Sequence, residues 1–381
     1  MDIAASTPLL GGLSPQDFMR RHWQKKPLLI RQALPGVAPP VTRADLFALA
    51  ADEAVESRLV ERQDSRWSLR HGPFGRRQLP AVRQSGWTLL VQGVDLHVDA
   101  AHELLSRFRF VPDARLDDLL ISYATDGGGV GPHFDSYDVF LLQVHGRRRW
   151  RIGRVDDASL EPDVPLKILA RFEPEEECLL EPGDMLYLPP RWAHDGVAEG
   201  ECMTCSIGFR APTTDEVGRE TLHRLLDAEE ADAAPVLYGD ASQAATGAPG
   251  RIPASLQAFC AEAVARLVES PTALACALGE WLSEPKPRVS FEAGTALRDE
   301  TGLVLDRRTR MLYDDDHLFI NGESYRAGGA DATLMRQLAD RRVLLPEQWR
   351  RASDEARDLL AEWAEAGWLH AMNDEPKEED R

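Results

Sequence analysis

The sequence is poor in cysteine, has no long apolar run and carries few basic residues for its length. Five cysteines in 381 residues, an odd number without regular spacing, exclude a disulfide scaffold and fit a reducing compartment. No apolar run approaches the roughly 20 residues of a membrane-spanning helix, which argues against a membrane protein. Lysine and arginine total 44 against 63 acidic residues, and this net charge of −19 argues against a broad basic surface for nucleic acid.

The first residues also lack the basic stretch of a secretory signal, so we expect a cytoplasmic protein. Hydrophobic residues make up 43% of the chain, which is enough for two or three domains with their own cores. The acidic excess favours a basic partner through electrostatic steering, although solubility alone also explains such a balance.

What the sequence does contain is a pattern of metal ligands. His133 and Asp135 are two residues apart, and in an extended strand such residues point to the same face. A second imidazole from His194 completes a set of two histidines and one carboxylate, which leaves open positions on one side of a metal. That set is typical of non-haem Fe(II) oxygenases. A His-x-Asp pair alone also occurs by chance on many protein surfaces, so its surroundings decide.

Both ligand segments lie beside short predicted strands. Residues 126–132 are rich in glycine and precede His133, and in such a segment the backbone can approach a ligand closely. Upstream of His194, residues 181–190 predict a turn, a short apolar strand and a proline stop. These short strands beside each ligand are what a small β-barrel requires.

A third segment predicts a cation inside that barrel. On a strand over residues 146–152, Arg148 shares one face with Trp150 and Ile152, which should be the interior face. Burying an unpaired charge is costly, so Arg148 needs an anionic partner. Two partners are open on spacing alone: a protein carboxylate, or the distal carboxylate of a 2-oxo dicarboxylic acid held by the guanidinium fork.

Together these segments resemble the JmjC-type ribosomal oxygenases, and most of all the bacterial branch of that family. The similarity is carried by residues 127–140, 146–152 and 182–190, with further matches at 18–30 and 205–212. It spans nearly the whole chain and is looser beyond residue 212. It implies a double-stranded β-helix (jelly-roll) core, Fe(II), and 2-oxoglutarate and O2 as cosubstrates. It also implies that Arg148 holds the distal carboxylate of 2-oxoglutarate, and that an arginine side chain of a basic large-subunit ribosomal protein is hydroxylated.

Five further residues are predicted near this centre. Thr204 and Ser206 share one face of a predicted strand, and they point either toward the cosubstrate or into a cross-strand hydrogen bond. Asp126, Tyr137 and Asp138 flank the metal motif and are predicted to contact a substrate guanidinium. An acid on an exposed loop without such a role is the commoner outcome for the two aspartates.

The predicted fold class is α+β, in four segments. Residues 1–212 form the JmjC double-stranded β-helix with its N-terminal additions, and residues 213–284 form a helical region. Residues 285–373 form a winged-helix domain, and residues 374–381 are an acidic tail that we expect to be disordered. The family uses its helical region for dimerisation, so a homodimer is expected. The winged helix has no strongly basic recognition helix, so a structural or protein-binding role is favoured over nucleic-acid binding.

Local signals support this division. Helical spacing and capping residues predict helices that begin near Ser14, Thr213, Ser255 and Ser270. The pair Asn321-Gly322 suits a two-residue type I′ hairpin turn. Two other functions remain open at this point: a JmjC-type lysine demethylase, and a metal-binding cupin that serves as an assembly factor without catalysis.

Overall fold

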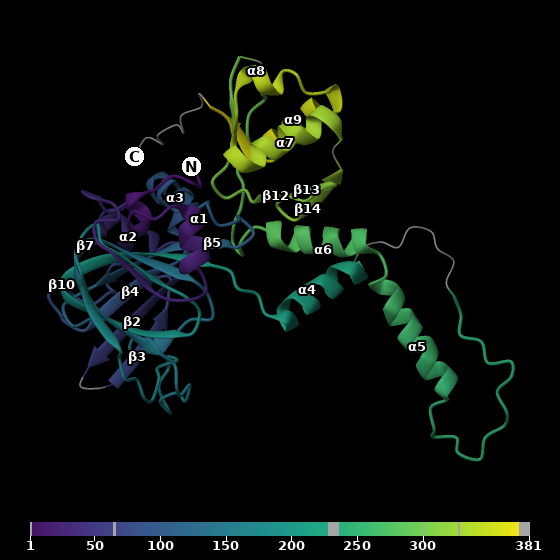
Figure 1. The fold of residues 1–381 in the computed structure, drawn as a ribbon, viewed down its shortest axis with the longest axis horizontal. Coiled ribbons are helices and arrows are strands. Elements are labelled where there is room, and N and C mark those ends of the chain that lie inside the picture. Colours follow the sequence, from purple (N-terminus) through teal and green to yellow (C-terminus); the bar gives the residue numbers. More distant parts are fainter. Residues whose placement is uncertain (1, 64–65, 228–235, 299, 327, 373–381) are drawn as a thin grey trace. The chain divides into compact units, whose positions relative to one another are not determined.

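The computed structural model describes residues 2–63, 66–227, 236–298, 300–326 and 328–372 (Figure 1). The predicted acidic tail at 374–381 lies outside these residues. The chain divides into two compact units, Met1–Ala211 and Pro212–Arg381. Within the described residues, no helix combines the length and the apolar composition that crossing a bilayer requires.

The first unit begins with short helices and continues into a sheet. In chain order its elements are η1 (Pro8–Leu10), α1 (Pro15–Arg21), β1 (Leu28–Ile30), α2 (Arg43–Leu49), β2 (Ser57–Gln63), β3 (Arg66–His71), β4 (Trp87–Val91), η2 (Val94–Leu96), α3 (Asp99–Ser106), β5 (Leu116–Ala124), β6 (His133–Phe134), β7 (Val139–Arg154), β8 (Glu176–Leu180), β9 (Met185–Leu188) and β10 (Trp192–Phe209). Helix α1 starts where it was predicted, because the hydroxyl of Ser14 accepts a hydrogen bond from the backbone N–H of Asp17.

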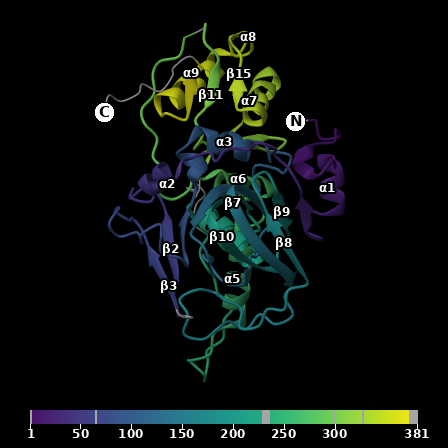
Figure 2. The same ribbon diagram turned by 90° about the vertical axis from the view of Figure 1, so that its left-hand side faces the viewer.

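These ten strands form one antiparallel sheet in the order β1-β9-β7-β10-β5-β4-β2-β3, with β6 paired to β10 and β8 to β7. The two longest strands, β7 with 16 residues and β10 with 18, pair along almost their whole length. The sheet curls around its own inner face (Figure 2). The predicted jelly-roll fold is thus confirmed.

A bulge changes which residues of β7 face inward. The pairing register shifts twice: residues 200–202 of β10 lie opposite Gly146, and then Met203 pairs with His145 but Thr204 with Gln143, so that Val144 is an extra residue in β7. Gly146 has a φ of +61°, and a Cβ there would lie 2.0 Å from the carbonyl oxygen of Glu201. Before the bulge the odd-numbered Val139 and Leu141 pack with the inner cluster; after it the even-numbered Trp150 and Ile152 do so. A bulge inserts one residue and reverses the alternation, and this reversal places Arg148 on the inner face.

The outer face of the sheet carries the main hydrophobic core. Phe18 of α1, Leu46 of α2 and Leu104 of α3 pack there with Phe140 and other residues of the strands. Covering this face with helices satisfies the apolar side chains that point out of the barrel. The inner face has only a small apolar cluster of its own, so it retains room for polar groups.

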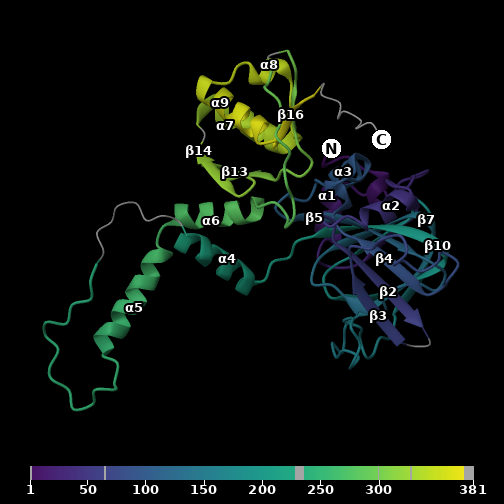
Figure 3. The same cartoon turned by 180° about the vertical axis from the view of Figure 1, so that it is seen from behind.

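The second unit combines three helices with a small α+β domain. In chain order its elements are α4 (Thr214–Asp227), α5 (Ala254–Leu267), α6 (Pro271–Ser283), β11 (Leu303–Leu305), β12 (Met311–Tyr313), β13 (His317–Ile320), β14 (Glu323–Arg326), α7 (Gly329–Arg341), β15 (Val343–Leu344), α8 (Pro346–Trp349), α9 (Asp354–Glu365) and β16 (Leu369–Ala371). Helix α6 packs against α4 and against β12–β14, and a Cβ at Gly279 would lie 2.4 Å from the ring of Phe319. Helix α5 buries none of its described residues (Figure 3).

The elements from β11 to β16 form the predicted winged helix. Helices α7, α8 and α9 accompany the sheet β15-β11-β16 and the sheet β12-β13-β14. The hairpin between β13 and β14 turns at Asn321 and Gly322, whose φ values of +49° and +92° suit the predicted type I′ turn. Gly367 has a φ of +75° just beyond α9, the left-handed conformation that commonly ends a helix.

Candidate metal centre

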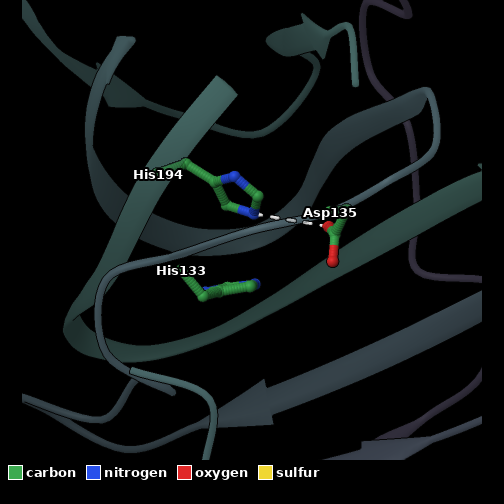
Figure 4. A group of neighbouring side chains, drawn as sticks. All are labelled: His133, Asp135 and His194. Carbon is green, nitrogen blue, oxygen red and sulfur yellow. Dashed lines mark ion pairs between the residues drawn. The ribbon is translucent and has the colours of Figure 1, made fainter. Parts of the chain in front are cut away.

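His133, Asp135 and His194 come together in the first unit. Each offers one ligand atom, and these three atoms all lie within 4.8 Å of one another (Figure 4). The Nε2 atom of His194 lies 3.7 Å from Oδ2 of Asp135, and the two imidazole centroids are 4.2 Å apart. Two imidazoles and a carboxylate on one side of a point are a facial set of metal ligands, as the sequence predicts.

Strand pairing creates this arrangement. Strand β6 is only two residues long and pairs with the start of β10, with His133 directly opposite His194. Asp135 follows at the next same-face position, and its carbonyl oxygen accepts a hydrogen bond from the N–H of Arg191 at 2.8 Å. This bond fixes the backbone beyond β6, so that the carboxylate is held beside the two rings.

The second nitrogen of each imidazole is held by the backbone. Nδ1 of His133 lies 2.9 Å from the carbonyl oxygen of Gly131, and Nδ1 of His194 lies 3.0 Å from that of Trp192. A carbonyl oxygen can only accept a hydrogen bond, so each Nδ1 must donate one and carries the N–H. Each Nε2 of the neutral ring then presents a lone pair. Burial, together with the nearby His133, lowers the pKa of His194 to about 4. A neutral imidazole is the form that binds metal.

The glycine-rich segment before His133 serves close packing between backbones. A Cβ at Gly128 would lie 2.4 Å from the carbonyl oxygen of Trp87, and one at Gly129 would lie 2.6 Å from that of Gly196. The N–H of Gly127 also donates to the carbonyl of Ala198. We predicted a close approach to a ligand; in the described residues the close approach is to β4 and β10.

The predicted inward face of β7 is confirmed. Arg148 and Trp150 are each 5% exposed, whereas the neighbouring arginines point outward and pair with acids. Arg149 contacts Glu177 and Glu199 on the outer surface. The Trp150 ring lies 5.8 Å from that of His194, and Gly196 provides space for it, because a Cβ there would be 2.6 Å from the indole.

Arg148 has no carboxylate partner among the described residues. Its Nη1 donates to Oγ of Ser122 at 3.0 Å, while its Nε and Nη2 are buried without any hydrogen-bond acceptor. The first partner left open by the sequence, a protein carboxylate, is therefore not present in the described part of the chain. A buried guanidinium with two nitrogens that lack an acceptor in the described residues has the chemistry to bind an anion.

Thr204 and Ser206 line the same inner face. Thr204 is opposite Ser122 on β5 and Gln143 on β7, and its hydroxyl donates to the side-chain oxygen of Gln143 at 2.9 Å. Ser206 lies two residues further along that face and is partly exposed. One of the two predicted alternatives, a cross-strand hydrogen bond, is therefore present at Thr204. A contact of either hydroxyl with a cosubstrate stays a prediction.

Two of the three predicted substrate residues have roles inside the fold. Asp138 is 0% exposed, and its carboxylate accepts hydrogen bonds from Tyr187 and Gln24, so a direct contact with a substrate conflicts with its burial. Burial raises the pKa of Asp138, against these hydrogen bonds. Asp126 is exposed, and its Oδ1 accepts a hydrogen bond from the N–H of Gly200 at 2.8 Å.

Tyr137 lies close to Asp135. Its side chain is 39% exposed. Burial of the phenol group, together with the charges of Asp135 and Asp118, raises its pKa. The hydroxyl is therefore a neutral donor beside a metal ligand, which suits a residue that contacts a substrate.

Sequence reasoning missed two residues that bond the polar side chains of the inner face: Ser122 accepts from Arg148, and Gln143 accepts from Thr204. Ser122 and Gln143 lie on β5 and β7 in stretches that read as ordinary barrel strands. The available signal was a buried polar residue in the middle of each apolar run, since such residues need a partner on the same face. Gly196 was also missed, although a glycine two residues after a ligand on a strand indicates a close contact.

Comparison with known proteins agrees with this centre. Family profiles match at residues 103–217 for the JmjC domain and at residues 266–370 for a ROXA-like winged helix. The ribosomal protein uL16 3-hydroxylase of Escherichia coli is 34% identical over 320 residues, which cover 81% of this chain and 84% of that protein. The chain belongs to the ribosomal oxygenase family. The winged-helix match of this ribosomal oxygenase takes in α6, which the predicted boundary at residue 285 leaves out.

Solved structures support the assignment over nearly the whole chain. The X-ray structure of E. coli YcfD matches with a TM-score of 0.83 and 31% identity, covering 94% of this ribosomal oxygenase and 98% of YcfD. A structure of YcfD in complex with cobalt and 2-oxoglutarate matches with a TM-score of 0.79 at 30% identity, with the same coverage. A probable ribosomal oxygenase of Haemophilus influenzae is 39% identical over 52% of this chain and 50% of its own.

Proposed function

We propose that this ribosomal oxygenase is an Fe(II)- and 2-oxoglutarate-dependent dioxygenase that hydroxylates an arginine side chain of a large-subunit ribosomal protein. The observation that carries the proposal is the pairing of two features on one inner face. One is the triad of His133, Asp135 and His194; the other is the buried Arg148 without a carboxylate partner. A metal triad alone suits many functions, but a free buried guanidinium beside it suits an anionic cosubstrate.

The three ligands fit a divalent metal of the iron type. Both imidazoles present Nε2 because Nδ1 is held by a backbone carbonyl, and the low pKa of His194 keeps its ring neutral. Two histidines and a carboxylate leave open positions, which is the arrangement that Fe(II) oxygenases use. When bound, Fe(II) would supply the oxygen chemistry that inserts one oxygen atom into a C–H bond.

The protein itself would orient the cosubstrate. Arg148 offers two nitrogens, Nε and Nη2, that have no acceptor in the described residues, and a guanidinium fork matches the two oxygens of a carboxylate. Ser122 holds the guanidinium from the other side, and Thr204 and Ser206 place hydroxyls on the same face. Arg148 would thus take the distal carboxylate of 2-oxoglutarate, while the other end of that dicarboxylate reaches the metal.

The walls of the barrel would keep water away from this anchor. Trp150, Leu180 and Leu186 are nearly fully buried around the inner face. The guanidinium also lies 5.8 Å from the Trp150 ring. In such apolar surroundings an ion pair between Arg148 and a carboxylate is stronger than in water.

The substrate would enter from the open side. The net charge of −19 favours a basic protein partner, and Tyr137 presents a neutral hydroxyl beside Asp135. A relative in this family is named for hydroxylation of ribosomal protein uL16, so uL16 is the first substrate to test. Asp126 stays a weaker proposal for a substrate contact, because its carboxylate already accepts one hydrogen bond.

The deciding experiment is intact-mass analysis of unmodified large-subunit ribosomal proteins. They are incubated with the enzyme, Fe(II), ascorbate and O2, with and without 2-oxoglutarate, and the product is digested to locate the modification. We expect uL16 to gain a single oxygen on an arginine only when 2-oxoglutarate is present. Succinate formation without any mass gain would keep the oxygenase and exclude this substrate; absence of both would favour a binding cupin without catalysis.

A second reaction is favoured by other relatives. A protein of Aedes aegypti named as a bifunctional lysine-specific demethylase and histidyl-hydroxylase is 27% identical over 46% of this chain. Hydroxylation of a methyl group on lysine leads to release of formaldehyde, whereas arginine hydroxylation retains the oxygen on the product. Formaldehyde formed from a methylated peptide, with no oxygen gain on ribosomal proteins, would select the demethylase.

We also propose that the enzyme acts in the cytoplasm as a homodimer through its helical region. Helix α5 buries no residue of its own, and apolar side chains of α4 and α5 are exposed, among them Leu226 at 64% and Val264 at 54%. Isolated chains rarely leave such side chains together in water. Light scattering of the wild type and of a Leu226→Glu variant tests this: a monomeric wild type would exclude the dimer.

A further inference from the structure

One stretch of the catalytic unit carries the opposite charge to the rest of the protein. Residues 62–83 contain six arginines and one acid, Asp64, a formal charge of +5. Since the whole chain carries −19, the remaining residues sum to −24. All six arginines are exposed. Arg62 pairs with Trp67 and points to one side of the β2–β3 pair, whereas Arg66 and Arg70 point to the other. We name the other five the arginine face: Arg66, Arg70, Arg76, Arg77 and Arg83.

The arginine face is not neutralised within the described part of the protein. There, only Arg70 of the five has a carboxylate within 4 Å, that of Glu61 at 3.2 Å. By contrast, the outward arginines of β7 each meet an acid, as Arg151 meets Asp195. Like charges that crowd together without partners repel one another, and a bound polyanion would relieve that repulsion.

The strand that carries Arg66 and Arg70 also reaches the metal centre, with its opposite side. Strand β3 is the last strand of the sheet, and its outer edge has no partner strand among the described residues (Figure 2). The Trp67 ring of β3 would lie 3.2 Å from a Cβ at Gly131, two residues before the ligand His133. The Arg62 guanidinium lies over that ring, 5.3 Å from its centroid. A polymer on this edge would therefore pass close to the protein substrate.

We propose that the arginine face binds the phosphate backbone of RNA. A row of arginines suits phosphates, because the guanidinium fork binds two oxygens and keeps its charge at every pH. Arg66 and Arg70 lie on one face of β3, and the unpaired edge adds backbone N–H donors that also bond phosphate oxygens. The net charge of the whole chain led us to expect no nucleic-acid binding, but that average conceals this local surface.

This inference goes beyond the proposed function and can fail or succeed without it. RNA binding needs neither metal nor 2-oxoglutarate, and it does not depend on which residue is hydroxylated. If both hold, the enzyme would meet a ribosomal protein together with the RNA to which such proteins bind. The binding measurement therefore uses no turnover.

The test is fluorescence anisotropy of a labelled oligouridine of about 20 nucleotides with the full-length protein. The salt concentration is varied from about 0.05 to about 0.2 M, because phosphate contacts respond strongly to salt in this range. The variant is Arg76→Gln with Arg77→Gln, and the matched control is Arg20→Gln with Arg21→Gln, another exposed adjacent pair in the same unit. Each phosphate contact on a single strand contributes about 0.7 to the salt slope, so losing two should lower the slope by about 1.4 and weaken binding roughly 25-fold at 0.1 M salt.

Each outcome decides the inference. A selective loss in the Arg76/Arg77 pair, with an unchanged melting temperature, supports it. No RNA binding at the lowest salt, or an equal loss in the control pair, overturns it. Binding of oligothymidine as tightly as oligouridine overturns the choice of RNA and leaves general phosphate binding. Displacement of RNA by an equal charge of poly-glutamate overturns it in favour of an acidic protein partner.

Discussion

His133 and His194 lie directly opposite each other on β6 and β10, although 61 residues separate them in the chain, and their imidazole centroids are 4.2 Å apart. Strand register alone therefore sets the distance between two of the three proposed metal ligands. The third, Asp135, follows from the two-residue period of the same extended segment. A change at any of the three should leave the barrel intact and remove metal binding.

We expect His133→Ala to abolish turnover and to lower affinity for Co(II), measured by calorimetry, by more than about 100-fold, since even outer partners of metal ligands are worth 10–100-fold. The matched control is His145→Ala, an exposed histidine of β7, which should bind the metal like the wild type. Full activity of His133→Ala would remove this residue from the ligand set.

Arg148 should affect ligand binding and stability in opposite directions. In the free protein its guanidinium is buried with two unpaired donors, so Arg148→Met should raise the melting temperature without ligand. The same change should weaken 2-oxoglutarate binding by at least about 30-fold, the lower end of the 2–5 kcal/mol that a truncated buried charge pair costs. The control is Arg149→Met, whose guanidinium points outward to Glu177 and Glu199.

Thermal shift with saturating 2-oxoglutarate and Co(II) reads out both effects. Relative to Co(II) alone, 2-oxoglutarate should stabilise the wild type, because the cosubstrate binds only the folded state, and it should add much less stability to Arg148→Met. A variant that melts lower than the wild type without ligand would show that Arg148 has a stabilising partner in the fold. A variant that still gains stability from 2-oxoglutarate would place the anchor elsewhere.

The ligands and the inward face of β7 could be predicted because they depend on local periods. His133 and Asp135 follow the period of a strand, and Trp150 and Ile152 mark the interior by their apolar character. The hairpin at Asn321-Gly322 was equally local, since each residue there needs a positive φ. These features depend on few contacts with distant parts of the chain.

The features that could not be predicted depend on distant contacts. Asp138 looked like a loop acid, but Tyr187, 49 residues away, and Gln24, 114 residues away, enclose its carboxylate. Likewise the hydrogen-bond partner of Arg148 in the described part of the chain is Ser122, on another strand. A sequence shows that a buried charge needs a partner, but only the register of the sheet shows which residue supplies it.

Tyr137 and Asp138 are adjacent, but their substitution should affect different properties: substrate binding for Tyr137 and stability for Asp138. Tyr137→Ala should raise the KM for the protein substrate and leave the melting temperature nearly unchanged, because its side chain is 39% exposed. Asp138→Ala should destabilise the fold by about 1–3 kcal/mol, because the hydroxyl of Tyr187 loses its buried acceptor. Thermal melts and substrate titrations of both variants separate the two roles; a normal melt with a raised KM in Asp138→Ala would restore it as a substrate residue.

Gly196 should be intolerant of any side chain. A Cβ there would lie 2.6 Å from the indole of Trp150, which itself lies beside His194. Gly196→Ala should therefore cost about 1–3 kcal/mol of unfolding free energy, the usual range for overpacking. Denaturant titration measures this cost, and the double variant with Trp150→Leu should recover most of it. Failure of the second change to restore stability would mean that the strain arises in the backbone of β10.

Asp306 should make the winged helix sensitive to acid. The residue is 7% exposed, and burial opposes its ionisation; hydrogen bonds from His370 and Arg308 outweigh that effect and hold its pKa well below the usual range. A carboxyl group whose pKa is lowered by folding adds stability above its ordinary pKa of about 4, and this stability is lost as the pH falls below that value. Strands β11 and β16, which flank Asp306 and contain His370, should therefore open first.

Hydrogen exchange of peptides that cover residues 303–305 and 369–371 measures this opening in the full-length protein. Between pH 7 and pH 3, after correction for the intrinsic exchange rate, protection of these strands should fall in the wild type. Asp306→Asn should lose about 1.5–3 kcal/mol at pH 7, the value of hydrogen bonds to a charged group, and should show little further loss in acid. Protection that stays constant in the wild type down to pH 3 would mean that the ionised carboxylate contributes nothing to this domain, and that neutral hydrogen bonds suffice.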